Sequence, residues 1–429
     1  MEKAKVYFTD LRALPGNNLL LKLQKLMRAA GVESIDFEQK YVAVKMHFGE
    51  PGNLAFLRPN YARAVADVIK ELGGRPFLTD CNTLYPGLRK NALDHLDAAA
   101  ENGFNPTTTG CQVIIGDGLK GTDDVAVSVI GGEYVKEAKI GRAVMDADIF
   151  VSLSHFKGHE STGFGGALKN IGMGCGSRAG KMEQHAGGKP EVRTERCRKC
   201  RACARSCGQD AIAFDGNEGT ARINHDRCVG CGRCIGACNF DAIFNPNDST
   251  NVELCCKMAE YAKAVVDGRP QFHISLVIDV SPLCDCYSGN DLPILPDVGM
   301  FASFDAVALD QACADACQRQ AVIPGSVLDE HMHAQGFCDH HDHFKNTEPN
   351  SEWEACLAHA EKIGRGTRQY ELITVKSEDR GGPAPPPPPL RSLRGRSRNG
   401  SFRPPYLKRL SLKTHLFSGQ FVTPIMKYL

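Results

Sequence analysis

Two runs of closely spaced cysteines constrain this chain more than any other feature of its sequence. Both runs have the spacing C-x₂-C-x₂-C-x₃-C, and their flanks repeat as well, as SCGQDAIAF and ACNFDAIFN. The first run contains Cys197, Cys200, Cys203 and Cys207, and the second contains Cys228, Cys231, Cys234 and Cys238. Such spacing wraps a tight loop of thiolates around an iron–sulfur cubane. The repeat therefore predicts two [4Fe–4S] clusters.

The two clusters are expected to share ligands between the runs. In this arrangement the first three cysteines of a run bind one cluster, and the fourth binds the other. One cluster then takes Cys197, Cys200, Cys203 and Cys238. The other takes Cys228, Cys231, Cys234 and Cys207. Zinc is the alternative metal, but a zinc site of this type uses two separated pairs of ligands, which the tight triplets do not favour.

Strand-like and helix-like segments alternate on both sides of the cysteine runs. We expect strands at 5–10, 41–48, 75–80, 111–117, 148–156, 273–280 and 370–375, and helices at 17–31, 60–74, 88–103, 136–147, 251–268 and 304–317. This alternation predicts an α/β fold with a largely parallel sheet. The predicted parts are an α/β body at 1–189 and 247–375, an inserted bacterial-ferredoxin-like module at 190–246, and a tail at 376–429.

Charge and composition exclude several classes of protein. The formal net charge of +1 gives the chain no global attraction to nucleic acid or to an anionic membrane. No apolar run approaches the roughly 18 residues of a spanning helix, and the first residues lack the apolar core of a signal peptide. We therefore expect a cytoplasmic protein, in which most of the 19 cysteines do not form disulfides and a large share binds metal.

The tail differs in composition from the body. From Lys376 onward it carries eleven Lys or Arg residues but two Asp or Glu residues, together with a run of prolines. Such sequence buries too little apolar surface to fold. We expect a disordered extension; the alternatives are a basic arm for nucleic acid or a Pro-rich ligand for a partner protein.

Polar and reactive side chains follow four of the predicted strands. They are His47 and Glu50; Asp80, Cys81, Asn82 and Thr83; His155, Lys157 and His159; and Cys284, Asp285 and Cys286. In a parallel sheet, ligands bind beyond the carboxyl ends of the strands, so these positions predict one shared site. His155, Lys157 and His159 are the candidate catalytic residues, as proton donors or as holders of a small anionic substrate. Alternatively, the histidines only cap or pack.

Three further groups of residues have ligand-type chemistry. In HFKGHESTGFGGALKNIGMGCG, residues 155–176, the glycines allow close backbone approach, and we expect a phosphate or carboxylate ligand at the start of the following helix. Cys284 and Cys286 form a candidate second metal site, with two thiolates for a soft metal or a third cluster; inert buried cysteine is the alternative. A last group follows no predicted strand: Cys338, His340, His341 and His343.

Several of these motifs together resemble a known family. VAVKMHFGEPGN, LTDCNTLYPGLR, the segment at 155–176, both cysteine runs, DVSPLCDCYSGNDLPILPDVGMFASFDAVALDQA and EKIGRGTRQYEL occur in this order over about residues 1–375. In these motifs the chain resembles the family called domain of unknown function 362, in its ferredoxin-bearing form. The resemblance implies an iron–sulfur protein with an α/β body, whose reaction is not established. It implies the eight cluster ligands and a site lined by residues 155–175 and by Cys284 and Cys286.

Three functions are consistent with these observations. The first is an iron–sulfur oxidoreductase, in which two clusters feed electrons to a site in the body that acts on a small anionic molecule and a redox partner protein supplies the electrons. The second is a non-catalytic ferredoxin-like carrier, or a subunit of a larger redox complex. The third is an iron–sulfur sensor whose basic tail contacts nucleic acid. The inserted position of the module favours the first, because an insertion fixes the distance between the clusters and the body.

Overall fold

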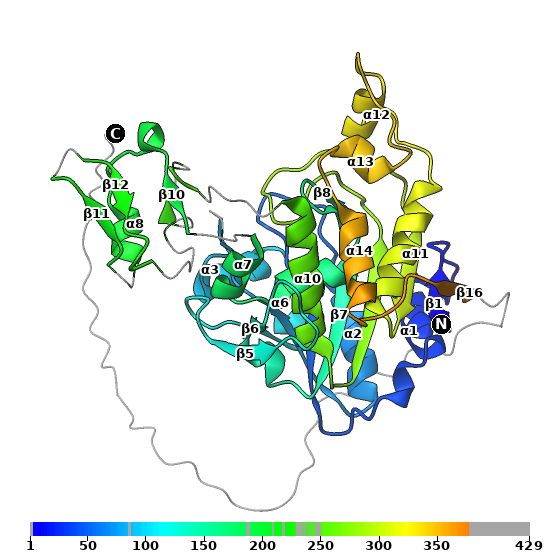
Figure 1. Ribbon diagram of the computed structural model, residues 1–429. Coiled ribbons are helices and arrows are strands. Elements are labelled where there is room, and N and C mark those ends of the chain that lie inside the picture. Colours follow the sequence, from blue (N-terminus) through cyan, green and yellow to red (C-terminus); the bar gives the residue numbers. More distant parts are fainter. Residues whose placement is uncertain are drawn as a thin grey trace, which may run out of the picture. The chain divides into compact units, whose positions relative to one another are not determined.

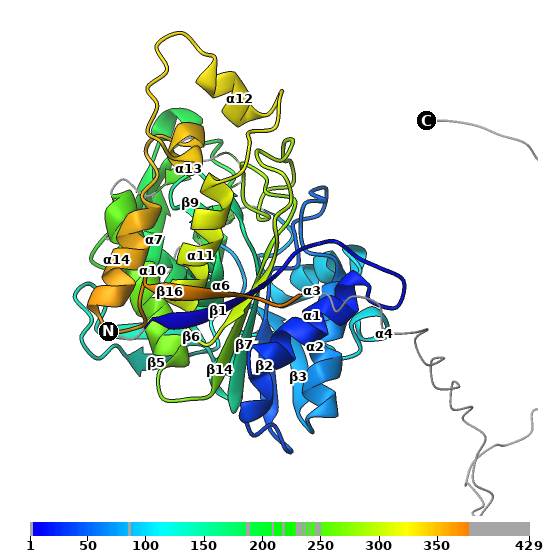
Figure 2. The ribbon, with the colours of Figure 1, turned by 90° about the vertical axis from the view of Figure 1, so that its right-hand side faces the viewer.

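One eight-stranded sheet organises the protein (Figures 1 and 2). The computed structural model describes residues 3–84, 87–185, 189–207, 210–216, 219–228, 234, 237–238, 240, 242–244 and 250–376. In spatial order, the strands are β16 (Tyr370–Thr374), β1 (Ala4–Thr9), β15 (Gly299–Ser303), β14 (Gln271–Val277), β7 (Ile149–His155), β2 (Tyr41–Lys45), β3 (Arg75–Asp80) and β4 (Gln112–Ile115). Strand β15 runs antiparallel to both neighbours, and all other pairs in this sheet are parallel. The predicted α/β fold with a largely parallel sheet is confirmed.

Helices cover both faces of the sheet (Figure 2). One face carries α1 (Leu19–Ala29), α2 (Pro59–Glu71), α3 (Ala92–Glu101) and α4 (Pro106–Thr109). The other face carries α6 (Ala167–Cys175), α7 (Arg178–His185), α10 (Asn251–Val266), α11 (Ala306–Gln318) and α14 (Trp353–Lys362). Within the described part of the chain, no helix has both the length and the apolar character needed to cross a bilayer.

Two hydrophobic cores lie between these layers, and strand side chains alternate between them. In β2, Val42 and Val44 join the core under α1 and α2, whereas Ala43 joins the core under α6 and α11. In β7, Leu153 joins the core under α1 and α2, and Phe150 joins the core under α6 and α11. Since successive side chains of a strand point to opposite faces, strands buried on both sides become nearly continuous apolar runs. That is why the sequence marks these strands so clearly.

The described residues also form shorter elements, which include 3-10 helices at Val32–Ser34 and Thr194–Arg196. The small strands pair as β5 (Asp124–Ser128) with β6 (Glu137–Gly141), β8 (Lys157–His159) with β9 (Gly163–Gly165), β10 (Glu191–Val192) with β13 (Ile243–Phe244), and β11 (Ile212–Phe214) with β12 (Ala221–Ile223). The short helices are α5 (Arg142–Met145), α8 (Ala202–Ser206), α12 (Val327–Met332) and α13 (His343–Thr347).

One predicted helix is wrong. Residues 136–147 form strand β6 and the single turn α5 instead. In β6 the buried side chains Ala138 and Ile140 lie two positions apart, which is the period of a strand. Antiparallel pairing with β5 overrides the helix propensity of the Glu, Ala and Lys residues in this segment.

The cysteine-rich segment lies in the chain between two neighbouring strands of one sheet. β7 ends at His155, β14 begins at Gln271, and the two strands pair in parallel. The chain divides into two units, residues 1–381 and 382–429. Apart from Lys376, the predicted disordered tail at 376–429 lies outside the described residues, as does Cys231.

Helices α6 and α10 approach each other closely at Gly172. A Cβ atom added at this position would lie 2.1 Å from the backbone oxygen of Met258 in α10. Because the obstacle is backbone, no side chain rotation relieves the overlap. The glycine therefore sets the spacing between α6 and α10, two of the helices on this face of the sheet.

We expect Gly172→Ala to lower the free energy of unfolding by about 1–3 kcal/mol, because the added methyl group pushes α6 and α10 apart. Gly289→Ala is the control, since a Cβ there meets nothing within 4 Å and is expected to change stability by less than about 0.5 kcal/mol. Denaturant unfolding of both variants measures the difference. Equal stability of Gly172→Ala and wild type would contradict this account of the packing.

Candidate functional site

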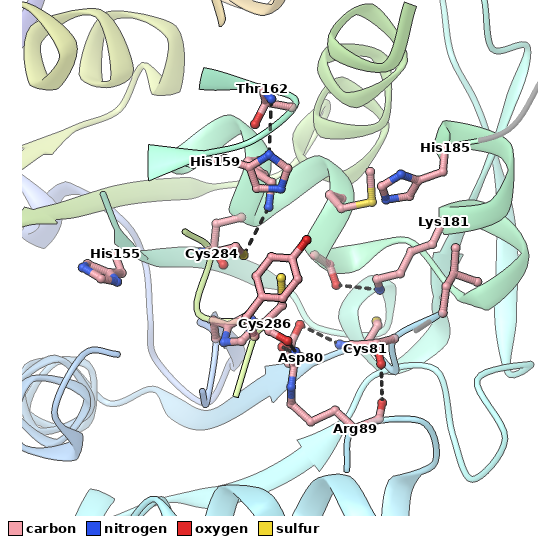
Figure 3. Close-up of a pocket in the computed structure, with 18 of the residues that line it drawn as sticks. Asp80, Cys81, Arg89, His155, His159, Thr162, Lys181, His185, Cys284 and Cys286 are labelled. Carbon is pink, nitrogen blue, oxygen red and sulfur yellow. Dashed lines mark hydrogen bonds and ion pairs between the residues drawn. The ribbon is translucent and has the colours of Figure 1, made fainter. Parts of the chain in front are cut away.

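A cavity of about 420 Å³ lies at the carboxyl ends of β2, β3, β7 and β14 (Figure 3). Most residues predicted at the strand ends line it: His47, Asp80, Cys81, Thr83, His155, Lys157, His159, Cys284 and Cys286. Three others lie outside the lining and hold polar groups in place: Glu50 binds Arg89, Asn82 binds Asp117, and Asp285 binds His155. The structure thus brings the four strand ends together in one pocket.

The pocket is rich in cations. Lys45, Arg89, Lys157, Lys169 and Lys181 line it, whereas the lining contains two carboxylates, Asp80 and Glu160. Lys45, Arg89 and Lys181 are not among the residues expected at this site from the sequence. Lys45 is the last residue of a buried strand, and a lysine at that position indicates a site at the strand end. The sequence around Arg89 and Lys181 gives no comparable indication. The excess of positive charge suits an anionic ligand.

Buried carboxylates hold several of these cations. The Lys45 Nζ atom lies 3.0 Å from Asp80 Oδ1 and donates to Asn170 Oδ1 at 2.9 Å. Arg89, which is 2% exposed, pairs with Glu50 at 2.8 Å and lies 3.9 Å from Asp80. Burial alone would raise the pKa of Asp80, but Lys45 and the other positive neighbours lower it overall. Asp80 therefore stays ionised and fixes the floor of the pocket.

His155 is engaged at both ring nitrogens. Its Nδ1 atom lies 2.8 Å from Asp285 Oδ1, and its Nε2 atom lies 2.8 Å from the carbonyl oxygen of Ile278. In Figure 3 it stands apart from the other labelled side chains. Against the penalty of burial, His155, Lys157 and Lys169 lower the pKa of Asp285 to about 2. With both nitrogens occupied, His155 is suited to positioning Asp285 and its turn.

His159 and His47 are held as neutral rings. The Nδ1 atom of His159 accepts from the backbone N–H groups of Ser161 and Thr162 at 3.1 and 3.2 Å, and that of His47 accepts from Gly49 at 2.9 Å. Burial, aided by nearby cations, lowers both pKa values well below the usual range. Each ring therefore keeps its proton on Nε2, where it can donate to an anion.

Strand β8 aims Lys157 and His159 at the pocket. Alternate residues of an extended strand share a face, so Gly158 between them faces the other way, against the segment that follows β14. The Gly158 N–H donates to Ser281 O at 2.8 Å, and a Cβ atom there would lie 2.5 Å from Pro282 O. Glycine allows this close approach, and the contact fixes the two neighbours.

Cys284 and Cys286 lie beside Lys169. The Lys169 Nζ atom is 3.6 Å from Cys284 Sγ. A hydrogen bond from the Cys286 thiol, followed by the charges of Lys169 and Lys157, lowers the pKa of Cys284 well below its usual value. The same hydrogen bond raises the pKa of Cys286. Lys169 therefore favours a thiolate at Cys284, and the shared hydrogen bond favours a thiol at Cys286.

The expected anion site at the start of the helix in residues 155–176 is wrong, because the protein fills that position itself. Helix α6 begins at Ala167, and the N–H groups of Ala167 and Leu168 donate to the Asp310 carboxylate at 2.6 and 2.8 Å. A carboxylate is a natural partner for a helix N-terminus. Asp310 belongs to α11 and lies too far along the chain for local sequence reasoning to find.

In the cysteine-rich segment, four cysteines line one small cavity. They are the four assigned to a common cluster: Cys197, Cys200, Cys203 and Cys238. Burial, with a smaller contribution from the other three thiols, raises the pKa of Cys203 to about 11. Of the second set, Cys207, Cys228 and Cys234 are described and Cys231 is not.

The described residues form no site for a single metal ion. No three His, Cys, Asp or Glu side chains in that part of the chain converge closely enough to hold one ion. A cubane spans four irons, so its thiolates stand farther apart than the ligands of a single ion. The metal role predicted for Cys284 and Cys286 stays a prediction, as does any role of the group at Cys338 and His340.

We expect Asp285→Asn to lower the free energy of unfolding by about 2 kcal/mol at pH 7, which corresponds to the shift of its pKa from 3.8 to about 2. The folded-state pKa is depressed, so this stability is present above pH 4 and is lost as the pH falls toward 2. Urea unfolding between pH 5 and 8 therefore gives a constant difference.

Asp123→Asn is the control for this prediction. Asp123 makes an exposed ion pair with Arg142 at 3.2 Å, so its loss changes stability by less than about 1 kcal/mol. A difference for Asp285→Asn that disappeared by pH 5 would contradict the account of the buried carboxylate.

Comparison with known proteins gives one family and a few distant likenesses. A thylakoid-associated protein of Synechocystis sp. is 27% identical over 131 residues, which cover 29% of this chain and 35% of that protein. The chain thus aligns with about a third of the length of this relative. The lactate racemase apoprotein from Thermoanaerobacterium thermosaccharolyticum superimposes with a TM-score of 0.31 and 11% identity, over 64% of this chain and 51% of that one.

A second solved structure, a structural-genomics target from Thermotoga maritima, has a TM-score of 0.36 and 12% identity, over 72% of this chain and 59% of that chain. Neither structural likeness carries an argument about function. The family match is more extensive, because residues 42–315 fit the family described as Domain of unknown function (DUF362). This range is more than half of the chain and includes the pocket residues from Lys45 to Cys286. The protein therefore belongs to the DUF362 family.

Proposed function

We propose that this protein is an iron–sulfur oxidoreductase, in which two [4Fe–4S] clusters pass electrons to a small anionic substrate bound in the cationic pocket. The single observation that carries the proposal is where the cysteine-rich segment joins the body. His185 precedes that segment and Leu254 follows it, and both line the pocket. The segment is therefore tethered at both ends to the rim of the site that it would serve.

The cysteines themselves support the choice of cofactor. The four assigned to one cluster line a common cavity, although they come from two runs. Bound there, a [4Fe–4S] cluster would supply one-electron transfer. Cys200 is exposed, which leaves this set open to a redox partner protein.

The pocket supports the choice of substrate class. Lys157 and Lys169 supply positive charge on one side, and the Nε2–H groups of His159 and His47 supply neutral donors. Because His159 resists protonation, it holds a developing negative charge without offering a second proton. Lys157 is the remaining proton donor among the three residues predicted as catalytic. His155 positions Asp285, which in turn lies 3.6 Å from Lys157.

The cluster half of the proposal is tested by anaerobic purification, with iron, sulfide and zinc counted per chain and an EPR spectrum recorded after reduction. We expect about eight irons and eight sulfides. Cys203→Ser should lower the iron content by about half, while Cys338→Ser, an exposed cysteine outside both runs, should leave it unchanged. Zinc in place of iron would overturn the electron-transfer function.

The substrate half is tested by mixing the reduced protein with a panel of small carboxylates, phosphates and oxyanions while cluster absorbance is followed. A substrate is an anion that reoxidises the clusters rapidly. We expect Lys157→Met to slow this reaction by about 10²-fold or more, whereas Lys3→Met, at the opposite end of the sheet, has no effect. Equal rates in both variants would remove the pocket from the reaction.

The carrier function predicts a different outcome of the same measurements. A non-catalytic carrier would contain about eight irons, pass electrons to a partner protein, and be reoxidised by none of the anions. Its rates would also be independent of Lys157.

A further inference from the structure

Cys284 and Cys286 sit in a tight turn that brings their side chains together. The N–H group of Tyr287 donates to the carbonyl oxygen of Cys284 at 3.2 Å, which closes a turn with Asp285 and Cys286 at its centre. Across this turn the two thiols share a hydrogen bond. Both line the pocket (Figure 3). Residues two positions apart in such a turn have Cα atoms within the roughly 4.4–6.8 Å that a disulfide bond spans.

The charges around this pair do not suit a metal ion. Lys169 lies 3.6 Å from Cys284 Sγ, Lys157 also acts on the same thiol, and the Arg89 guanidinium donates to the carbonyl oxygen of Cys286 at 3.4 Å. Asp285 lies between the two cysteines but turns to His155. Cations stabilise a thiolate and repel a metal cation. In the described residues, no third ligand converges on the pair.

We propose that Cys284 and Cys286 form a redox-active dithiol–disulfide pair that exchanges two electrons with a small anionic thiol or disulfide in the pocket. In the oxidising direction, Cys284 thiolate attacks the disulfide RSSR and releases RS⁻. The Cys286 thiol then loses its proton and attacks Cys284 Sγ, which forms the protein disulfide and releases a second RS⁻. The disulfide RSSR is reduced to two thiols, and the protein loses two electrons.

The environments of the two sulfurs assign their roles. Cys284 is 2% exposed and is stabilised as a thiolate by Lys169, so it is the attacking sulfur in oxidation and the better leaving group in reduction. Cys286 is the more exposed of the two and carries the proton, so it resolves the mixed disulfide. A low-pKa thiolate beside a second cysteine is the arrangement of reactive thiol pairs.

This thiol chemistry needs no iron. It concerns the same pocket as the proposed function, but a protein that contained no clusters would still form the disulfide. Conversely, a protein loaded with clusters could keep the two thiols inert. The two proposals therefore fail separately.

The test uses the full-length protein, reduced under anaerobic conditions and then exposed to glutathione disulfide, an anionic probe. After acid quenching and alkylation, mass spectrometry identifies the state of each cysteine. In the wild type we expect a peptide lighter by two hydrogen atoms, with Cys284 joined to Cys286 and no glutathione retained there. Cys286→Ser should trap glutathione on Cys284, while Cys284→Ser should react at Cys286 at least about tenfold more slowly.

Variants and probes of altered charge distinguish a reaction guided by the cationic pocket from ordinary thiol–disulfide exchange. In the Cys286→Ser background, Lys169→Met should slow glutathione capture by about tenfold, and Lys3→Met should not. Cystamine, a cationic disulfide, should react more slowly than glutathione disulfide.

The proposal is overturned if Cys284 and Cys286 of the wild type remain free thiols while the exposed Cys338 reacts. It is equally overturned if the pair retains a metal ion that Cys284→Ser loses. The first of these outcomes is measured on the wild-type protein. The proposal can therefore be tested even if a variant fails to fold.

Discussion

The pocket depends on buried ion pairs that keep several cations in place. A lysine or arginine removed from water is costly unless a carboxylate pairs with it, and taking away one partner leaves an uncompensated charge. Asp80 forms ion pairs with Lys45 and Arg89. Glu50 pairs with Arg89, and Asp285 pairs with Lys157. These carboxylates lie beneath the cavity or in its wall. A ligand in the cavity would thus meet lysine and arginine side chains whose positive charges are already balanced by these carboxylates.

The same arrangement accounts for the different roles of His159 and His155. Where a ring nitrogen accepts from backbone N–H groups in a cationic pocket, as in His159, the neutral form is the stable one. Where both nitrogens face acceptors, as in His155, the ring becomes a support for a carboxylate. His155 and His159 lie four positions apart in the chain. They have different roles because different backbone groups face their ring nitrogens.

Much of the fold and the position of the site could be predicted from the sequence. Strands buried on both faces stand out as apolar runs, and the carboxyl ends of parallel strands meet at one edge, so His47, Asp80, His155 and Cys284 could be placed together. The contributions of Arg89 and Lys181 could not, because they come from a loop and a helix whose position depends on tertiary packing. The anion site expected at the start of α6 is wrong for a related reason. Asp310, which binds the N–H groups there, is distant in the sequence. Segment 136–147 was misread because strand pairing outweighed local propensity.

The placement of the cysteine-rich segment has a consequence for how the molecule forms. β7 and β14 are neighbours in the sheet, yet residues 156–270 separate them in the chain. Closing so long a loop costs entropy before any strand pairing compensates for it, and non-local pairing is slow. A segment that compacts early shortens the loop that remains to be closed. During synthesis, strands β2, β3, β4 and β7 emerge before the inserted segment and can pair with one another. Strand β14 can join them only after the segment has been made, so the cavity, which needs Cys284 and Cys286, would be among the last features to assemble.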